Sequence, residues 1–221
     1  MAVEHPNGAL FVSGYGAARF NEHRPPNLWT SRDHGATWRR VNIGSDADSL
    51  GNSDVDLAVA RDGTLYFANL GYEGQNREDN FITVGVSRDA AETWSWKTLS
   101  KNRFDDRPWI KVAPDGMAHL IWNDGGVFYR ASRDRGVTWS EKARIGEHGG
   151  SSHMAVGPKG EVAVRITPLS ASGYGFDEGF DLIAVSADGG KTWQKHPAPG
   201  DREWAAGVDK SRQQDVPASA Q

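Results

Sequence analysis

The sequence contains no cysteine among its 221 residues. This absence excludes disulfide bonds, a thiolate nucleophile and thiolate metal ligands together. It does not indicate a compartment, because a reducing cytosol and a disulfide-free exported protein both fit. The opening residues MAVEHPNGAL lack the charged start and the apolar run of a signal peptide. The localisation is therefore unknown from composition.

The chain also lacks a cluster of basic residues and a long apolar run. Lys and Arg total 25 against 29 Asp and Glu, for a net charge of -4. We expect no nucleic-acid partner, because phosphate binding needs a concentrated positive face. No stretch approaches the roughly 20 apolar residues that span a bilayer, so we expect no membrane insertion. The seven histidines form no H-x-x-x-H or comparable pair, and we expect no metal site and no cofactor.

Glycine and tryptophan are abundant instead, with 26 and nine residues. This composition is typical of short strands that alternate with tight turns. One octapeptide, S-x-D-x-G-x-T-W, occurs four times. Its copies are SRDHGATW at 31–38, SRDAAETW at 87–94, SRDRGVTW at 132–139 and SADGGKTW at 186–193.

A second recurring unit precedes each octapeptide and reads as strand, tight glycine turn, strand. One repeat then predicts a four-stranded antiparallel meander of about 45 to 55 residues, the size of a propeller blade. We therefore predict an all-β fold, a β-propeller of four-stranded antiparallel blades over residues 1–200. The predicted blades lie at about 1–43, 54–100, 106–146 and 151–199, and a polar C-terminal tail follows at 201–221.

We interpret the octapeptide as a structural turn. Its Asp and Ser side chains can accept hydrogen bonds from nearby backbone N–H groups, and its glycine supplies a positive φ. The tryptophan offers a large apolar body to wedge between blades, while its N–H finds an acceptor. A calcium loop is the alternative, but the D-x-D-x-D-G spacing with a later Glu is absent. The structural residues are Asp33, Asp89, Asp134, Asp188, Trp38, Trp94, Trp139 and Trp193.

In the second octapeptide Ala91 takes the place of glycine. The replacement should cost on the order of 1 kcal/mol if φ is positive there.

The four octapeptides resemble the Asp-box, or BNR repeat, of sialidase-like β-propellers, and the resemblance covers almost the whole chain. The stretch DDRPWIKVAPDG at 105–116 looks like a blade start in bacterial exo-α-sialidase-like proteins. The resemblance implies a six-bladed propeller with an axial active site away from the Asp-boxes. It also implies three arginines on the sugar carboxylate, a tyrosine nucleophile paired with a glutamate, and an aspartate as acid/base. An extracytoplasmic or secreted location is suggested by the resemblance alone.

The chain departs from this family pattern in two respects. It contains no F/Y-R-I-P segment, the usual source of the first arginine, and only four blades are present. We therefore expect an open arc, an incomplete six-bladed sialidase-type propeller. Its open blade edges would invite self-association.

Antiparallel connectivity places the Asp-boxes on one face and the variable loops on the other. The variable loops at 14–26, 71–80 and 168–181 carry carboxylates, arginines and tyrosines, which suit a sugar site. Within them we predict Tyr174 as nucleophile with Glu178 as its base, because a phenol needs a neighbouring base. Arg77 is a predicted substrate-binding residue. A solvated, glycine-rich loop is the alternative interpretation of the Tyr174 segment.

The first residues of the innermost strands should ring the central axis. Aligning the repeats makes Asp54, Arg107 and Ser151 equivalent, and likewise Asp56, Trp109 and His153. We predict Asp54 as acid/base. We predict that Arg107 binds a carboxylate, because a guanidinium can do so bidentately, and the alternative is an ion pair with a neighbouring aspartate.

The remaining predicted substrate contacts are Asp56, Trp109, His153 and Arg165. For Arg165 the alternative is a structural role between two blades. The aspartates at 54 and 56 could also belong to a polar connection or to a loose oxygen site for Ca²⁺.

Three functions compete at this stage. The first is a sialidase-like glycoside hydrolase that acts on terminal sialic acid or a related acidic sugar. The second is a non-catalytic propeller that binds a glycan, a glycoconjugate or a protein. The third is a propeller fragment that another chain completes.

Overall fold

The computed structural model describes residues 1–14, 26–44, 54–73, 79–169, 179–198 and 203–204. These residues form strands, turns and connections, and no helix occurs among them. Within the same ranges there is accordingly no helix long and apolar enough to cross a membrane. The strands form four four-stranded antiparallel sheets and one two-stranded sheet. The predicted all-β class is confirmed.

Strands follow one another in chain order across each large sheet. The first sheet contains β1 (Ala2–Glu4), β2 (Leu10–Gly14), β3 (Asn27–Ser31) and β4 (Arg39–Arg40). The second contains β5 (Val55–Val59), β6 (Leu65–Glu73), β7 (Asp79–Ser87) and β8 (Ser95–Asn102). The third contains β9 (Asp105–Val112), β10 (Ala118–Asp124), β11 (Val127–Ser132) and β12 (Ala143–Gly146). The fourth contains β13 (Ser151–Val156), β14 (Val162–Ile166), β16 (Leu182–Ser186) and β17 (Gln194–Pro197).

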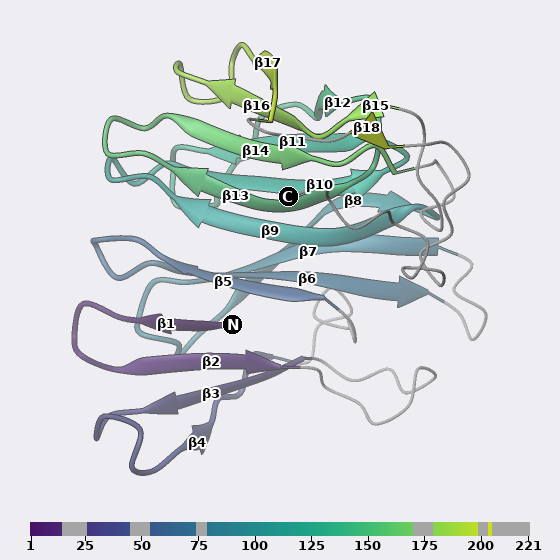
Figure 1. Cartoon of the computed structure of the whole chain (residues 1–221). Coiled ribbons are helices and arrows are strands. Elements are labelled where there is room, and N and C mark those ends of the chain that lie inside the picture. The colour runs from purple at the N-terminus through teal and green to yellow at the C-terminus, as the bar shows by residue number, and fades with distance from the viewer. Residues whose placement is uncertain (15–25, 45–53, 74–78, 170–178, 199–202, 205–221) are drawn as a thin grey trace, which may run out of the picture.

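The four sheets stack face to face as an open arc of propeller blades. Figure 1 shows them fanned from β1–β4 at the bottom to β13–β17 at the top. The first strands of the sheets are neighbours along the inner side, since β1 contacts β5, β5 contacts β9 and β9 contacts β13. Three separate cores fill the three spaces between consecutive sheets.

Strand alternation explains why each sheet can pack on both sides. On β6, Leu65 and Phe67 enter the core shared with the first sheet, whereas Tyr66 and Ala68 enter the core shared with the third. All four side chains are at most 1% exposed. A strand buried on both faces reads as a continuous apolar run, which matches LYFANL.

The loop predicted at 71–80 is shorter than the sequence indicated, and the connection between the second and third sheets is also short. β6 continues through Glu73 and β7 begins at Asp79, inside the predicted loop at 71–80. Leu70 and Tyr72 are both buried in the core between the second and third sheets, and this burial extends the strand. Likewise β8 continues to Asn102 and β9 already begins at Asp105.

The described part of the C-terminal segment contains one short strand. β18 (Glu203–Trp204) pairs antiparallel with β15 (Gly179–Phe180). Glu203 and Trp204 lie within the polar C-terminal tail predicted at 201–221. Residues 205–221 lie outside the described ranges.

Each Asp-box closes its turn with the same hydrogen bonds. The serine Oγ donates to the aspartate Oδ1 at 2.7–2.8 Å and accepts from the N–H of the fifth residue at 2.7–2.9 Å. The threonine donates its N–H to Oδ1 at 2.9 Å and its hydroxyl to Oδ2 at 2.5–2.6 Å. These bonds hold the pKa of Asp33 and Asp134 at about 2 and lower those of Asp89 and Asp188. The four carboxylates are thus engaged within their own turns.

The fourth and fifth residues of the boxes have left-handed backbone conformations. In the fourth box these are Gly189 and Gly190, with φ of 73° and 85°. In the second box Ala90 and Ala91 adopt φ of 56° and 73°. Ala91 therefore has the positive φ on which its expected destabilising effect depends, because a residue with a Cβ is strained in this conformation.

Three Asp-box tryptophans pack against the core that their sheet shares with the preceding one. Trp94, Trp139 and Trp193 each lie against such a core. Trp38 of the first sheet is instead 45% exposed, so it does not wedge between blades as expected. The indole N–H of Trp38 and of Trp193 donates to a carbonyl of its own box. Those of Trp94 and Trp139 have no hydrogen-bond partner within the described structure, which differs from the expectation.

Candidate functional site

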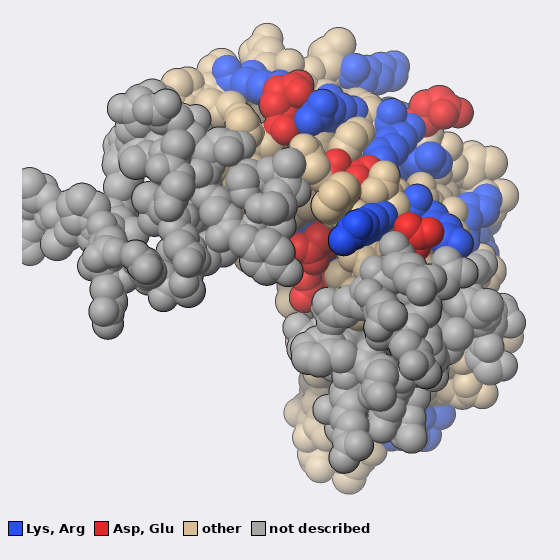
Figure 2. Space-filling view, turned by 90° about the vertical axis from the view of Figure 1, so that its right-hand side faces the viewer, with Lys and Arg blue, Asp and Glu red and all other residues tan. Residues whose placement is uncertain are grey.

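The loop edge of the sheets is the side opposite the Asp-box turns, where β5, β9 and β13 begin. Because β9 contacts both β5 and β13, the first residues of these three strands are neighbours in space. Figure 2 looks onto this side and shows basic and acidic side chains intermixed over the described surface. The predicted axial residues belong to this edge.

Arg107 occupies a distorted point of β9. The register between β9 and β10 shifts between Ile121 and Asn123, so a β-bulge lies at this level of β9. Arg107 has a φ of 49°, which is rare for a residue with a long side chain. Bulges and left-handed non-glycine residues concentrate at functional sites, where surrounding structure holds the strain.

The Arg107 side chain is accessible and weakly paired. Its side chain is 39% exposed, and its Nε lies 3.6 Å from Oδ2 of Asp106. An exposed pair of this kind contributes little stability, so the guanidinium can exchange its partner for a ligand carboxylate. The ion pair raised as an alternative at the sequence level is present, and its partner is Asp106 rather than Asp105.

Trp109 and His153 come together at the loop edge. Their ring centroids are 4.6 Å apart with an interplanar angle of 51°. Trp109 is partly buried against the core between the third and fourth sheets, whereas His153 is exposed. The Trp109 indole N–H has no partner among the described residues. The pair therefore places two aromatic rings close to the Arg107 bulge along β9, while the Trp109 N–H itself is buried.

Asp56 has a different position from the one expected. It is fully buried, and its Oδ2 accepts from the N–H of Ile110 at 2.9 Å and from Nζ of Lys111 at 3.4 Å. Burial raises its pKa, and the charge of Lys111 opposes the shift. Asp56 ties β5 to β9, so a carboxylate expected to touch substrate instead joins two sheets.

Asp54 and Arg165 complete the described candidates. Asp54 directly precedes β5, and its carbonyl accepts from the N–H of Leu70 at 2.9 Å. Arg165 lies on β14 and pairs with Asp181, whose side chain is buried while that of Arg165 is 48% exposed. Arg165 thus forms an ion pair within its own sheet region, and no contact between Arg165 and Arg107 is seen among the described residues.

Three predicted residues lie outside the described residues, as do parts of the loops predicted at 14–26, 71–80 and 168–181. The residues are Tyr174, Glu178 and Arg77. Their geometry relative to Arg107 is therefore not part of the site described here.

Sequence reasoning missed Asp105 as a buried carboxyl group. It is fully buried, and its Oδ1 accepts from Oγ of Ser100 at 2.9 Å and from Nε1 of Trp122 at 3.0 Å. Its Oδ2 has no partner in the described structure. Burial raises its pKa to about 7, the bond from Ser100 opposes the shift, and the nearby charge of Asp124 adds to it. The signal that could have found it is the double aspartate ahead of Arg107, of which only one can face solvent on a strand.

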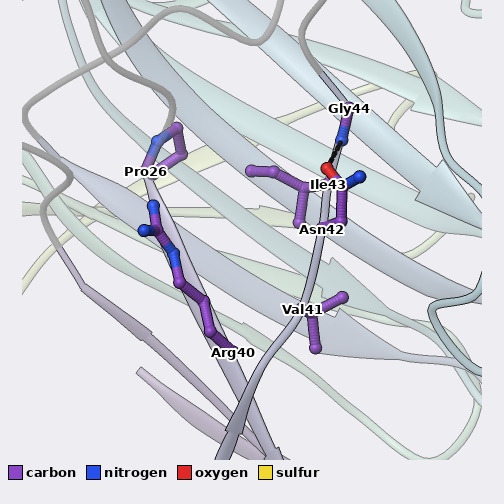
Figure 3. Close-up of a pocket in the computed structure, with 6 residues that line it drawn as sticks. All are labelled: Pro26, Arg40, Val41, Asn42, Ile43 and Gly44. Carbon is purple, nitrogen blue, oxygen red and sulfur yellow. Dashed lines mark hydrogen bonds between the residues drawn. The ribbon is translucent and has the colours of Figure 1, made fainter.

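No group of three or more His, Asp or Glu able to hold a metal ion occurs within the described ranges. A cavity of about 290 Å³ lies at the outer strand of the first sheet, lined by Pro26 and residues 40–44. Figure 3 shows Arg40 and Pro26 facing Asn42 and Gly44, with the Gly44 N–H donating to Asn42 Oδ1 at 3.1 Å. None of the predicted site residues lines this cavity, so it is separate from the loop-edge candidates.

Comparison with known proteins supports this architecture. The BNR/Asp-box repeat model matches residues 184–195, which contain the fourth octapeptide. No curated protein matches the sequence.

Several solved structures are similar in fold. The α-L-arabinofuranosidase of Fusarium graminearum in complex with arabinobiose has a TM-score of 0.64 at 16% identity, covering 89% of this chain and 64% of its own. A Hadza microbial sialidase has a TM-score of 0.61 at 17% identity, with coverage of 88% and 45%. The Trypanosoma rangeli sialidase has a TM-score of 0.56 at 19% identity, with coverage of 88% and 37%. This chain therefore spans less than two thirds of the length of these proteins.

These likenesses concern the fold, since all three identities are low. The arrangement they share with this chain is the one built above, in which antiparallel four-stranded sheets stack around an inner row of strands. The chain thus carries an Asp-box repeat and shares its fold with these sialidase and arabinofuranosidase structures.

Proposed function

We propose that this chain is a sialidase-like glycoside hydrolase that acts on terminal sialic acid or a related acidic sugar. The observation that carries the proposal is Arg107, an accessible guanidinium on a strained bulge of an inner strand. Trp109, two residues further along β9, packs at a tilt against His153 of the adjacent inner strand. A guanidinium for a carboxylate and an aromatic surface for a sugar ring are what an acidic sugar requires.

The catalytic roles in this proposal fall on the predicted variable loop at 168–181 and on Asp54. Tyr174 is the nucleophile and Glu178 its base, because a phenol with a pKa of about 10 needs such a neighbour to attack. Asp54, just ahead of β5, is the acid/base. Arg77 and Arg165 are the further candidate contacts to the substrate carboxylate, and Arg165 would have to leave Asp181 to make one.

Hydrolysis of a fluorogenic α-sialoside by the chain tests the proposal, with an α-L-arabinofuranoside and a neutral β-glucoside as comparison substrates. We expect turnover of the sialoside alone. Arg107→Ala should lower kcat/KM about 100-fold, which corresponds to about 2.7 kcal/mol of lost transition-state stabilisation. Tyr174→Phe should lower kcat below detection while the variant still binds the sugar.

Arg107→Gly separates the guanidinium from the backbone strain. Glycine accepts a φ of 49° without cost, so this variant should be more stable to denaturant than Arg107→Ala by about 1 kcal/mol. Both variants should lose the same activity. Arg39→Ala, an exposed arginine on β4 of the first sheet, is the matched control and should keep full activity. Absence of turnover on every aryl glycoside by the folded wild-type chain would remove the hydrolase from consideration.

The burial of Asp56 favours a second candidate function, a non-catalytic propeller that binds acidic glycans. Of the predicted carboxylates Asp54 and Asp56, the second joins two sheets, so fewer acids are available for chemistry. In that case sialyllactose binds to the wild-type chain without turnover, and Arg107→Ala abolishes the binding. Calorimetry with sialyllactose and lactose distinguishes the two functions.

A further inference from the structure

A second hollow lies on the other side of the molecule, among the Asp-boxes of the third and fourth sheets. This interbox cleft has a volume of about 460 Å³, within the range of small-ligand sites. Its apolar lining includes Met117, Tyr129 and Trp139. Its charged lining consists of Arg133, Glu141 and Lys191. None of these residues belongs to the site proposed above.

The equivalent position between the second and third sheets is bridged by basic side chains. There Nη2 of Arg88 donates to the carbonyl of Arg135 at 2.5 Å, and Nζ of Lys97 donates to the carbonyl of Val137 at 2.7 Å. Both bonds run from the second sheet to the Asp-box of the third. Two basic side chains therefore cross the boundary between these sheets.

The corresponding residues of the third sheet form ion pairs within that sheet, and Arg133 also lies beside Gly189 of the fourth box. Arg133, equivalent to Arg88, lies 4.0 Å from Asp115 of its own sheet. Lys142, equivalent to Lys97, pairs with Asp124 at 2.5 Å and lies over the ring of Phe128. The strand after the third box also begins later, because β12 starts at Ala143 whereas β8 starts at Ser95, next to Trp94. The boundary between the third and fourth sheets is thus joined by the hydrogen bond from Tyr129 to Gly189 rather than by Lys142, and the interbox cleft lies beside this bond.

The floor of the cleft is firmly held. The Tyr129 hydroxyl donates to the carbonyl of Gly189 at 3.1 Å and lies 2.7 Å from Nδ1 of the buried His119. Trp193 packs edge-on against Tyr129, with ring centroids 5.1 Å apart. A preformed floor lowers the entropic cost of binding.

The rim of the cleft carries two cations, Arg133 and Lys191, and one anion, Glu141. The partly buried indole of Trp139 also lines the cleft. Arg133 and Asp115 are each about 60% exposed at 4.0 Å, a pair that a ligand carboxylate can replace at little cost. Lys191 and the hydroxyl-bearing residues Thr138 and Ser140 also line the cleft. We propose that the interbox cleft binds an acidic saccharide residue, with a sugar face on Trp139 and its carboxylate between Arg133 and Lys191.

Binding can be measured by calorimetry with digalacturonate and with neutral galactobiose, using the full chain. We expect digalacturonate to bind at least about tenfold more tightly than galactobiose, with an affinity that falls as salt is raised. Lys191→Glu changes only an exposed side chain and should weaken digalacturonate binding at least about tenfold, without a change in thermal stability. Trp139→Ala should abolish binding.

Trp38→Ala is the matched control, because it removes an Asp-box tryptophan that lies outside the cleft. It should leave the affinity unchanged. Equal affinity for the two disaccharides, or digalacturonate binding that Lys191→Glu does not weaken, would overturn the proposal. Arg107→Ala should not affect this binding, so failure here and failure of the proposed hydrolase are distinguishable.

Discussion

The two edges of the sheets differ in how strictly they repeat. At the Asp-box edge, four turns make the same serine, aspartate and threonine hydrogen bonds within about 0.2 Å of one another. At the loop edge, equivalent positions of β5, β9 and β13 carry Asp56, Trp109 and His153, which make unlike contacts. Repetition marks what each blade needs in order to fold, and divergence marks where one blade can acquire a chemistry of its own.

The most severe break at the repeating edge is expected from Gly190→Ala. A Cβ at this position would lie 2.1 Å from the Tyr129 hydroxyl, and φ is 85°. Overpacking and backbone strain together should lower the free energy of unfolding by about 3 kcal/mol. Gly160→Ala has nearly the same φ, 84°, but open space around it, and should cost about 1 kcal/mol in the same denaturant titration. Equal costs would show that close approach to Tyr129 is unimportant.

The buried carboxyl group at the diverging edge predicts a pH dependence. The folded-state pKa of Asp105, about 7, lies above its unfolded value, so the folded state binds more protons between about pH 4 and pH 7. Its contribution to stability is therefore present below about pH 4 and is lost as the pH rises to 7. Asp105→Asn should remove this loss. The change that it causes in the free energy of unfolding should therefore be more favourable at pH 8 than at pH 4, by about 2 kcal/mol. Denaturant titrations at both pH values measure it.

Ser100→Ala supplies the opposing test of the same group. The Ser100 hydroxyl donates to Asp105 and favours the charged form. Its removal should make the fall in stability between pH 4 and pH 8 steeper. A profile that neither substitution alters would show that Asp105 does not titrate in this range.

The smallest expected effect concerns the imperfect second box. Ala90 has a φ of 56° at the position that Gly189 occupies in the fourth box. Ala90→Gly should raise the free energy of unfolding by about 0.5 kcal/mol, since relief of the left-handed strain exceeds the added unfolded-state entropy. Ala36→Gly, in the first box and outside the left-handed positions, should instead lower it by about 0.5 kcal/mol. The test is whether the two substitutions change the free energy of unfolding in opposite directions.

The repeating half of the molecule could be predicted closely from local patterns. Strand alternation, glycine turns and the octapeptide each act over a few residues, so their consequences are readable along the chain. The arrangement of the candidate site was predicted less well. Trp109 and His153 do meet, but Asp56 is buried between two sheets and Asp105 was not recognised as a buried acid.

By itself, the amino-acid sequence determined the all-β class, the four sheets and the engagement of the Asp-box side chains in turns, because these depend on contacts within a single repeat. Only the tertiary structure decided which carboxylates are buried, why Arg107 sits on a bulge, and why Arg88 and Lys97 bridge one boundary between sheets whereas the Tyr129 hydroxyl bridges the next. These features depend on side chains from two different sheets, and a pattern read along one strand holds no information about the side chains that its neighbour presents.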